Sequence, residues 1–310
     1  MTLASSSPSI GNAPISYGVF GATAGAPGVS PGELLAGIAE AGYAGCELGP
    51  PGFFGTPNET AAAFAAAGLG AVGAYVPIHF TAGEETLQLE LSALERSARE
   101  LVACGGQGVL ILADEGSRAL LSTPVHDPAD PRLTLDAAGW RRFAAVARRA
   151  QQLAVGYGLA TSFHPHISTY VERPSEIEAM LESTELSLTL DTGHLLLAGA
   201  DPLGALRVWR PRVNHVHVKD VRLAVLERAR SEGRTDFDSW WAQVCVPLGA
   251  GDVALEPFLN DLVAGGYDGW LVVEQDRAPT SREQYPEVAD EQRANLRFVR
   301  RALGDAAILV

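Results

Sequence analysis

Histidine and acidic side chains gather in one half of this 310-residue sequence. Five of the seven histidines fall between residues 164 and 217, namely His164, His166, His194, His215 and His217. Two carboxylates, Asp191 and Glu274, end apolar runs in the same half of the chain. Imidazole and carboxylate ligands without a thiolate suit Mn²⁺, Co²⁺, Zn²⁺ or Fe²⁺. The residue types therefore predict a divalent metal site.

The motif LSLTLDTGH (186–194) places Asp191 at the end of an apolar run, with His194 following across a Thr-Gly step. Functional groups of parallel barrels lie where strands end in this way. The competing interpretation of Asp191 is a helix N-cap, because aspartate is also a preferred capping residue.

The run VNHVHVKD (213–220) carries His215, His217 and Lys219 at alternate positions. Alternate residues of a strand share one face. Three polar residues on one face of a buried parallel strand are costly unless they meet a metal, a substrate or polar partners. His215, the deepest of the three, is most simply a core histidine with its hydrogen bonds satisfied.

Two more motifs complete the predicted set. In SFHPHISTY, His164 and His166 bracket Pro165, which suits a strand that is ending, so one histidine can bind metal while the other faces substrate. In WLVVEQD, Glu274 follows a fully apolar strand and needs a cation there, although a surface ion pair is the alternative. A metal ion at such a site can hold a ketone oxygen and a neighbouring hydroxyl, stabilising an enediolate while a base removes the α-proton.

Alternating strand and helix patterns must position these residues. We predict strands at 13–20, 45–49, 69–78, 108–113, 159–164, 186–191, 213–220 and 270–275, with helical periods between them. Eight such units predict a single α/β domain over residues 1–310, a (β/α)8 TIM barrel with a flexible tail at 1–11. A doubly wound sheet is the alternative, but no G-x-G-x-x-G follows the first strand. Long segments at 114–135 and 221–250 follow strands four and seven, so we expect both on the catalytic face.

Net charge, hydropathy and cysteine content limit the kinds of partner that we expect for this protein. The net charge of -14 disfavours nucleic acid, since phosphate contacts need clustered Lys and Arg. No stretch approaches the roughly 18 apolar residues of a membrane span. Three separated cysteines fit no disulfide framework. We therefore expect a cytoplasmic protein with no membrane partner.

The motifs LDTGH, HVHVKDVR, PLGAGD (247–252) and GYDGWLVVEQD resemble the xylose-isomerase-like barrel superfamily of sugar isomerases and epimerases, and within it the inosose dehydratase family. The resemblance covers nearly the whole chain. It implies a metal, with Mn²⁺ or Co²⁺ favoured over Zn²⁺, Fe²⁺ or Mg²⁺, bound by His164, Asp191, His217 and Glu274. The implied reaction removes water from 2-keto-myo-inositol, a keto-cyclitol.

The resemblance also implies roles for flanking residues. Lys219, His166 or Glu274 would act as the enolising base, and the substrate would contact Glu47, His194 and Arg222. Barrels of this superfamily are often dimers or tetramers, and Trp240 and Trp241 suit either a subunit interface or a lid.

One departure from the superfamily keeps other reactions open. Most members carry glutamate where this chain has His164, and paired-glutamate epimerases use that carboxylate as a base. The alternatives are a keto-sugar isomerase or epimerase, a 3-keto-glycoside lyase, and, from other classes, a DNA-repair endonuclease or a non-catalytic sugar-binding relative.

Overall fold

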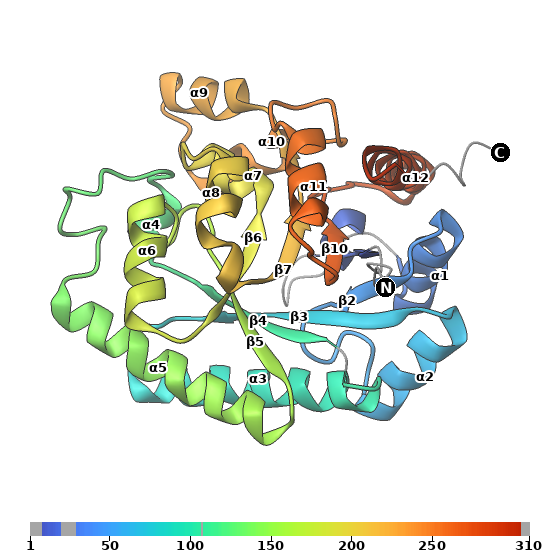
Figure 1. Cartoon of the computed structure of the whole chain (residues 1–310), viewed down its shortest axis with the longest axis horizontal. Coiled ribbons are helices and arrows are strands. Elements are labelled where there is room, and N and C mark those ends of the chain that lie inside the picture. The colour runs from blue at the N-terminus through green and yellow to red at the C-terminus, as the bar shows by residue number, and fades with distance from the viewer. Residues whose placement is uncertain (1–7, 20–28, 107, 305–310) are drawn as a thin grey trace, which may run out of the picture.

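The computed structural model of the chain describes residues 8–19, 29–106 and 108–304 (Figure 1). Within them, eight parallel strands close into a barrel in the order β1-β10-β7-β6-β5-β4-β3-β2. The strands are β1 Ser9–Asn12, β2 Gly45–Leu48, β3 Gly70–Ile78, β4 Val109–Asp114, β5 Ala160–His164, β6 Ser187–Asp191, β7 Val213–Val218 and β10 Trp270–Val273. The predicted TIM barrel is confirmed, and the doubly wound alternative is wrong because the sheet closes on itself.

The first strand lies elsewhere than predicted. We predicted a strand at 13–20, whereas β1 is Ser9–Asn12 and pairs with β10 from Ser9↔Trp270 to Asn12↔Val273. Pro14 then begins a short 3-10 helix, Pro14–Tyr17, since proline fits the first turn of a helix. The predicted flexible tail at 1–11 therefore does not include residues 9–11, while residues 1–7 lie outside the described residues.

Helices cover the outside of the barrel (Figure 1). The principal ones are α1 Pro31–Ala41, α2 Pro57–Ala67, α3 Glu84–Ala103, α5 Ala137–Gly156, α6 Pro174–Ser183, α8 Pro202–Trp209, α11 Leu255–Ala264 and α12 Tyr285–Ala302. Capping boxes begin α1 at Ser30 and α2 at Thr56. Fully buried side chains such as Leu94 of α3, Phe143 of α5 and Phe258 of α11 fill the layer between helices and sheet.

The long connections after β4 and β7 carry elements beyond the basic repeat. The link from β4 to α5 contains α4, Arg118–Leu121. The link from β7 to α11 contains β8 Asp220–Val221, α9 Leu223–Ser231, the 3-10 helix η3 Phe237–Ser239, α10 Trp241–Val244 and β9 Cys245–Val246. Strands β8 and β9 pair antiparallel, and the elements between them form an arm that rises at the top of Figure 1.

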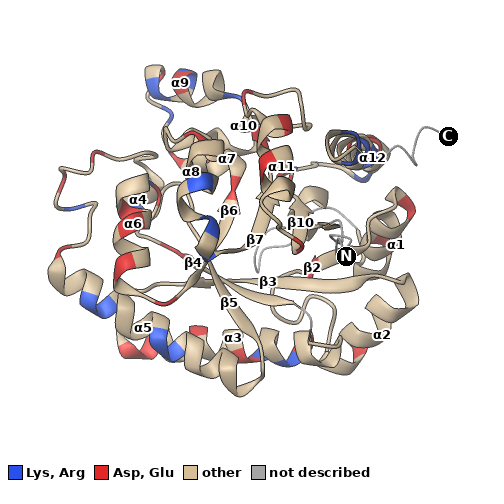
Figure 2. Ribbon diagram, viewed as in Figure 1, with Lys and Arg blue, Asp and Glu red and all other residues tan. Residues whose placement is uncertain are grey.

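The placement of charged residues and the hydropathy of the helices bear on the predicted absence of nucleic-acid and membrane partners. Figure 2 shows basic residues on α5, α8, α9 and α12, with acidic residues beside them on α9 and α12. In the part of the chain that is described, no helix is both long and apolar enough to cross a bilayer.

Candidate active site

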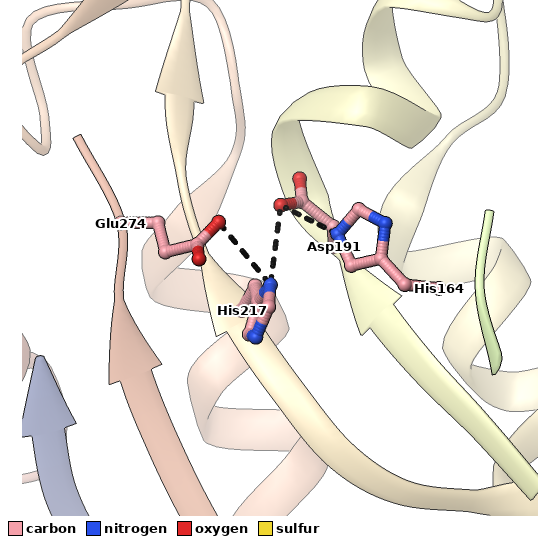
Figure 3. Close-up of side chains that lie close together, drawn as sticks. All are labelled: His164, Asp191, His217 and Glu274. Atoms are coloured by element: carbon pink, nitrogen blue, oxygen red, sulfur yellow. Dashed lines mark ion pairs between the residues drawn. The ribbon is translucent and has the colours of Figure 1, made fainter. Parts of the chain in front are cut away.

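Four buried side chains meet where β5, β6, β7 and β10 end (Figure 3). One ligand atom from each of His164, Asp191, His217 and Glu274 lies within 4.8 Å of the others. Asp191 Oδ2 is 3.5 Å from His164 Nε2 and 3.8 Å from His217 Nδ1. Glu274 Oε2 is 3.2 Å from the same His217 Nδ1. This cluster, hereafter the four-residue cluster, joins the residues predicted as metal ligands.

Strand register brings these side chains together. Asp191 is the register partner of His217 across β6 and β7, and His217 is the partner of Val272 across β7 and β10. Glu274 extends β10, because its backbone N–H donates to the Val218 carbonyl at 3.1 Å. The carboxyl ends of parallel strands meet at one end of a barrel, so four separate motifs converge there.

Asp191 is both an N-cap and a cluster residue. Its Oδ1 accepts the backbone N–H of His194 at 2.8 Å and caps α7, Thr192–Leu197. Its Oδ2 is buried and has no hydrogen-bond partner among the described residues. The two interpretations of Asp191 are thus compatible, because the cap fixes the carboxylate with one oxygen aimed into the cluster.

The cluster has the properties of a cation site. Asp191 Oδ2 and His217 Nδ1 are both buried without a hydrogen-bond partner in the described structure, an unusual cost for polar atoms. Two imidazoles and two carboxylates form a donor set that suits a first-row divalent ion. The group could therefore hold a metal ion.

Electrostatics point the same way. Burial opposes ionisation of Glu274, but His217 and Lys219 outweigh it and hold the pKa of that carboxyl well below its usual range. Burial likewise opposes charge on His217, yet Glu274 and Glu47 raise the pKa of the imidazole well above its usual value. Lys219 similarly offsets the effect of burial on Asp191, whose pKa is lowered. The carboxylates thus create a field that favours a positive charge.

Glu47 lies behind His217. Its Oε1 is 2.9 Å from His217 Nε2 and 2.8 Å from His215 Nε2, and all three residues are buried. Because Nε2 of His217 is used by Glu47, its Nδ1 faces Asp191 and Glu274. Carboxylates that bond the far nitrogen of a ligating histidine fix its tautomer and ring orientation. Glu47, expected at the mouth in contact with substrate, lies in the barrel interior against His215 and His217.

Lys219 is fully buried beside the cluster. Its Nζ is 2.8 Å from Asp276 Oδ1, 3.1 Å from Glu274 Oε2 and 3.6 Å from Asp191 Oδ2. Burial disfavours the ammonium, but Asp276, Glu274 and Asp191 outweigh it and hold the pKa of Lys219 well above its usual range. Lys219 therefore stands as a cation at the edge of the cluster.

An aromatic layer of His166, His194 and Trp241 packs beside the cluster and against Lys219. The His166 and His194 rings have centroids 4.0 Å apart, and Trp241 stacks on His194 at 4.9 Å and 21°. His166 Nδ1 lies 2.7 Å from the Ile167 carbonyl, and burial lowers the pKa of His166 to about 3. The His166 proton therefore sits on Nδ1 and leaves Nε2 as the acceptor. His194 Nδ1 accepts the Ile167 N–H at 3.2 Å, which makes Nε2 of His194 a donor.

Arg222 is the predicted site residue that the structure places apart. Its side chain is exposed, and a guanidinium nitrogen donates to the Ala250 carbonyl at 2.7 Å. The interface suggested for Trp240 and Trp241 is also not formed by exposed side chains, since these residues are only 1% and 4% exposed.

Sequence reasoning missed two residues. Asp276 lies at the site two positions beyond Glu274, and the signal was a second acid after the same apolar strand. Tyr75 of β3 packs edge-on against His164 at 5.9 Å, but one tyrosine in a long strand gives no distinguishing signal.

Comparison with known proteins defines the class. A family model described as xylose isomerase-like TIM barrel matches residues 35–302, so the chain belongs to that family. An inosose dehydratase of Geobacillus thermodenitrificans (strain NG80-2) is 29% identical over 257 residues, covering 80% of this chain and 82% of the relative. Another from Lacticaseibacillus casei is 32% identical over 197 residues, covering 60% and 63%. The predicted resemblance is confirmed.

Solved structures share the fold. A 3-keto-D-glucoside 4-epimerase from E. coli superposes with a TM-score of 0.68 at 17% identity, covering 95% of this chain and 99% of its own. A probable 3-DHS dehydratase from Bacillus anthracis gives a TM-score of 0.69 at 15% identity, covering 94% and 98%. At these identities the similarity shows that the fold is shared, so the reaction has to be inferred from the site residues.

Proposed function

We propose that this chain is a divalent-metal-dependent hydro-lyase that dehydrates a keto-cyclitol of the 2-keto-myo-inositol type. The observation that carries the proposal is the buried four-residue cluster, with a neutral histidine and an ammonium beside it. Its similarity over four-fifths of the chain to a protein named inosose dehydratase supports this substrate class.

The four-residue cluster would hold the metal, Mn²⁺ or Co²⁺ by preference. When bound, the metal would supply a Lewis acid that polarises a ketone and stabilises the negative charge left when a neighbouring carbon loses its proton. The carboxylates of Asp191 and Glu274 balance the charge of a divalent ion.

Proton transfer falls to the flanking residues. The unprotonated Nε2 of His166 is the base that takes the proton from the carbon next to the ketone, because its Nδ1–H is committed to the Ile167 carbonyl. Lys219 gives a proton to the departing β-hydroxyl as the carbon–oxygen bond breaks, so that water leaves. His166 then releases its proton to solvent, and Lys219 takes up a proton from solvent, which restores both side chains. Glu274, as a ligand 3.1 Å from Lys219 Nζ, keeps the ammonium in place.

Substrate hydroxyls need directed partners. His194 Nε2 is a buried donor without a partner among the described residues, so it can donate to a hydroxyl of the ring. A site with such unpaired donors favours a polyol over a less hydroxylated ketone.

The test is dehydration itself. Purified protein is stripped with a chelator, reloaded with Mn²⁺ or Co²⁺, and mixed with 2-keto-myo-inositol while the absorbance of the conjugated product is followed. We expect absorbance to rise only with metal, and His217→Gln to abolish the rise. His126→Gln, a buried histidine outside the cluster, is the control and should keep activity. Exchange of a substrate proton for deuterium without loss of water would refute dehydration and favour the epimerase alternative.

A further inference from the structure

The arm between β8 and β9 closes the cluster. Its residues Phe237 and Trp241 stack at 4.7 Å and 22°, and Trp241 in turn stacks on His194. The cluster residues below are at most 7% exposed. A surface hollow of about 730 Å³ is lined by 122–128, Arg173, 197–199, Arg230 and Thr235, none of them in the cluster. Because the cluster residues are buried beneath Trp241, access for a cyclitol ring requires the arm to move.

The base of the arm is anchored. Strands β8 and β9 pair only through Asp220↔Val246 and Val221↔Cys245. The Asp220 carboxylate accepts backbone N–H groups of Val221, Gly249, Gly251 and Val253 at 2.8–3.1 Å. A short ladder on a firmly held turn is the form expected of a hinge, about which the segment beyond it rotates once its contacts with the barrel are released.

The outer part of the arm contacts the β4–α5 connection, where Ser122 Oγ donates to Asp236 Oδ1 and Arg230 donates to the Pro124 carbonyl, each at 2.8 Å. A buried carboxylate holds Trp241 in the last helix of the arm. Asp276 Oδ2 accepts the Trp241 indole N–H at 2.7 Å, while Oδ1 of the same carboxylate pairs with Lys219 Nζ at 2.8 Å. The Lys219 ammonium also lies 5.3 Å from the centre of the Trp241 ring. Asp276 is 1% exposed, so both contacts are shielded from water, and hydrogen bonds to an ionised acceptor are the stronger kind.

We propose that Asp276 is a positioning residue that joins closure of the arm to placement of Lys219. When the arm is closed, one carboxylate fixes the indole and the ammonium together, so the proton donor is aimed only when the site is sealed. When the arm swings out on the β8–β9 hinge, Trp241 leaves and Lys219 becomes accessible. The kinetic part of this proposal rests on the proposed function, whereas the latch itself does not.

The composition offers a direct probe. Lys219 is the only lysine in the 310 residues, since the other basic residues are arginines. Reductive methylation of the Mn²⁺-loaded protein therefore modifies one side-chain amine, and the α-amine serves as an internal reference. Mass spectrometry of the peptide containing residue 219 then gives the rate at which the arm opens to solvent.

Two tryptophan variants form a matched pair. Trp241→Phe keeps a ring to stack but loses the N–H that reaches Asp276. Trp240→Phe makes the same change at the preceding residue, whose indole Nε1 is buried without a hydrogen-bond partner among the described residues. A hydrogen bond to a charged group is worth a factor of roughly 10 to 100, so Trp241→Phe should speed methylation of Lys219 by about that factor. Trp240→Phe should leave it near the wild-type rate.

Equal methylation rates in the two variants would overturn the latch. Asp276→Asn adds the kinetic readout, because it should lower kcat while leaving the Kd for Mn²⁺ and the KM within about threefold. An Asp276→Asn enzyme with wild-type kcat would overturn the positioning role. If wild-type protein dehydrates nothing, hydrogen exchange decides instead: Asp276→Asn must accelerate exchange in 223–244 but not in 187–191, and unchanged exchange refutes the coupling.

Discussion

Glu47→Gln isolates the carboxylate behind His217. The substitution keeps the shape and an acceptor oxygen but removes the negative charge that lies 2.9 Å from His217 Nε2. The pKa of Glu47 is lowered, since His217 and His215 outweigh the effect of burial, so the wild-type residue is ionised. The variant therefore tests whether charge behind the ligand matters to metal binding.

The size of the effect follows from these contacts. A charged acceptor is about twice as strong as a neutral one, so the bond to His217 should weaken by about 1 kcal/mol. Loss of orienting partners of ligating histidines typically costs about 10- to 100-fold in metal affinity. We expect Glu47→Gln to raise the Kd for Mn²⁺ about tenfold, and Glu47→Ala, which removes the acceptor altogether, to approach a hundredfold.

Isothermal titration of chelator-treated protein with Mn²⁺ measures the change. Glu100→Gln is the matched control, because Glu100 is also buried and its Oε1 also accepts a hydrogen bond, from the Gly52 N–H at 3.0 Å on the outside of the barrel. Its Kd should equal that of the wild type. If Glu47→Gln and Glu100→Gln bind Mn²⁺ equally well, Glu47 does not orient a ligand and the reasoning fails.

Three further predictions concern pH, packing and metal. Burial disfavours charge on His126, but Glu172 at 2.6 Å and Glu176 at 2.9 Å raise its pKa from 6.5 to about 9. Stability from this trio is full below pH 6.5 and lost as the pH rises through 9, so unfolding titrations should show wild type losing about 2–3 kcal/mol more than His126→Gln over that range. Equal losses would contradict it. Gly193→Ala would place a Cβ 2.8 Å from Lys219 Cγ, so kcat should fall while the Kd for Mn²⁺ holds; unchanged kcat would mean that Lys219 is not placed tightly. Mn²⁺ at a hundredfold excess over Kd should add about 2.7 kcal/mol and raise Tm by several degrees, and a Tm indifferent to chelator would argue against a structural ion site.

Most of the barrel could be predicted from the sequence, because parallel strands are buried on both faces and read as apolar runs. Seven of the eight strands lie where such runs occur. The exception, Ser9–Asn12, has the sequence SIGN, which carries little apolar signal, and it becomes a strand through its pairing with β10. Tertiary contacts, and not local sequence, make this segment a strand, as often happens when β-propensity is weak.

Those site residues that lie in or directly after strands could be predicted about as well as the strands themselves. Alternation in VNHVHVKD and the ends of LSLTLD and WLVVEQD identified side chains that do converge, since strand geometry alone fixes their direction. Glu47 and His217 are 170 residues apart and meet across the barrel interior, which no local pattern encodes. Trp241 reaches Asp276 only through the fold of the arm, so its position at the site required the structure.

Anomalous diffraction from crystals loaded with Mn²⁺ tests the central claim most directly, because the signal locates the ion without reference to activity. We predict one strong peak bounded by His164, Asp191, His217 and Glu274, with a ligand atom of each about 2.0–2.3 Å away. A peak between Glu47, His215 and His217, or none within reach of the four residues, would contradict the account.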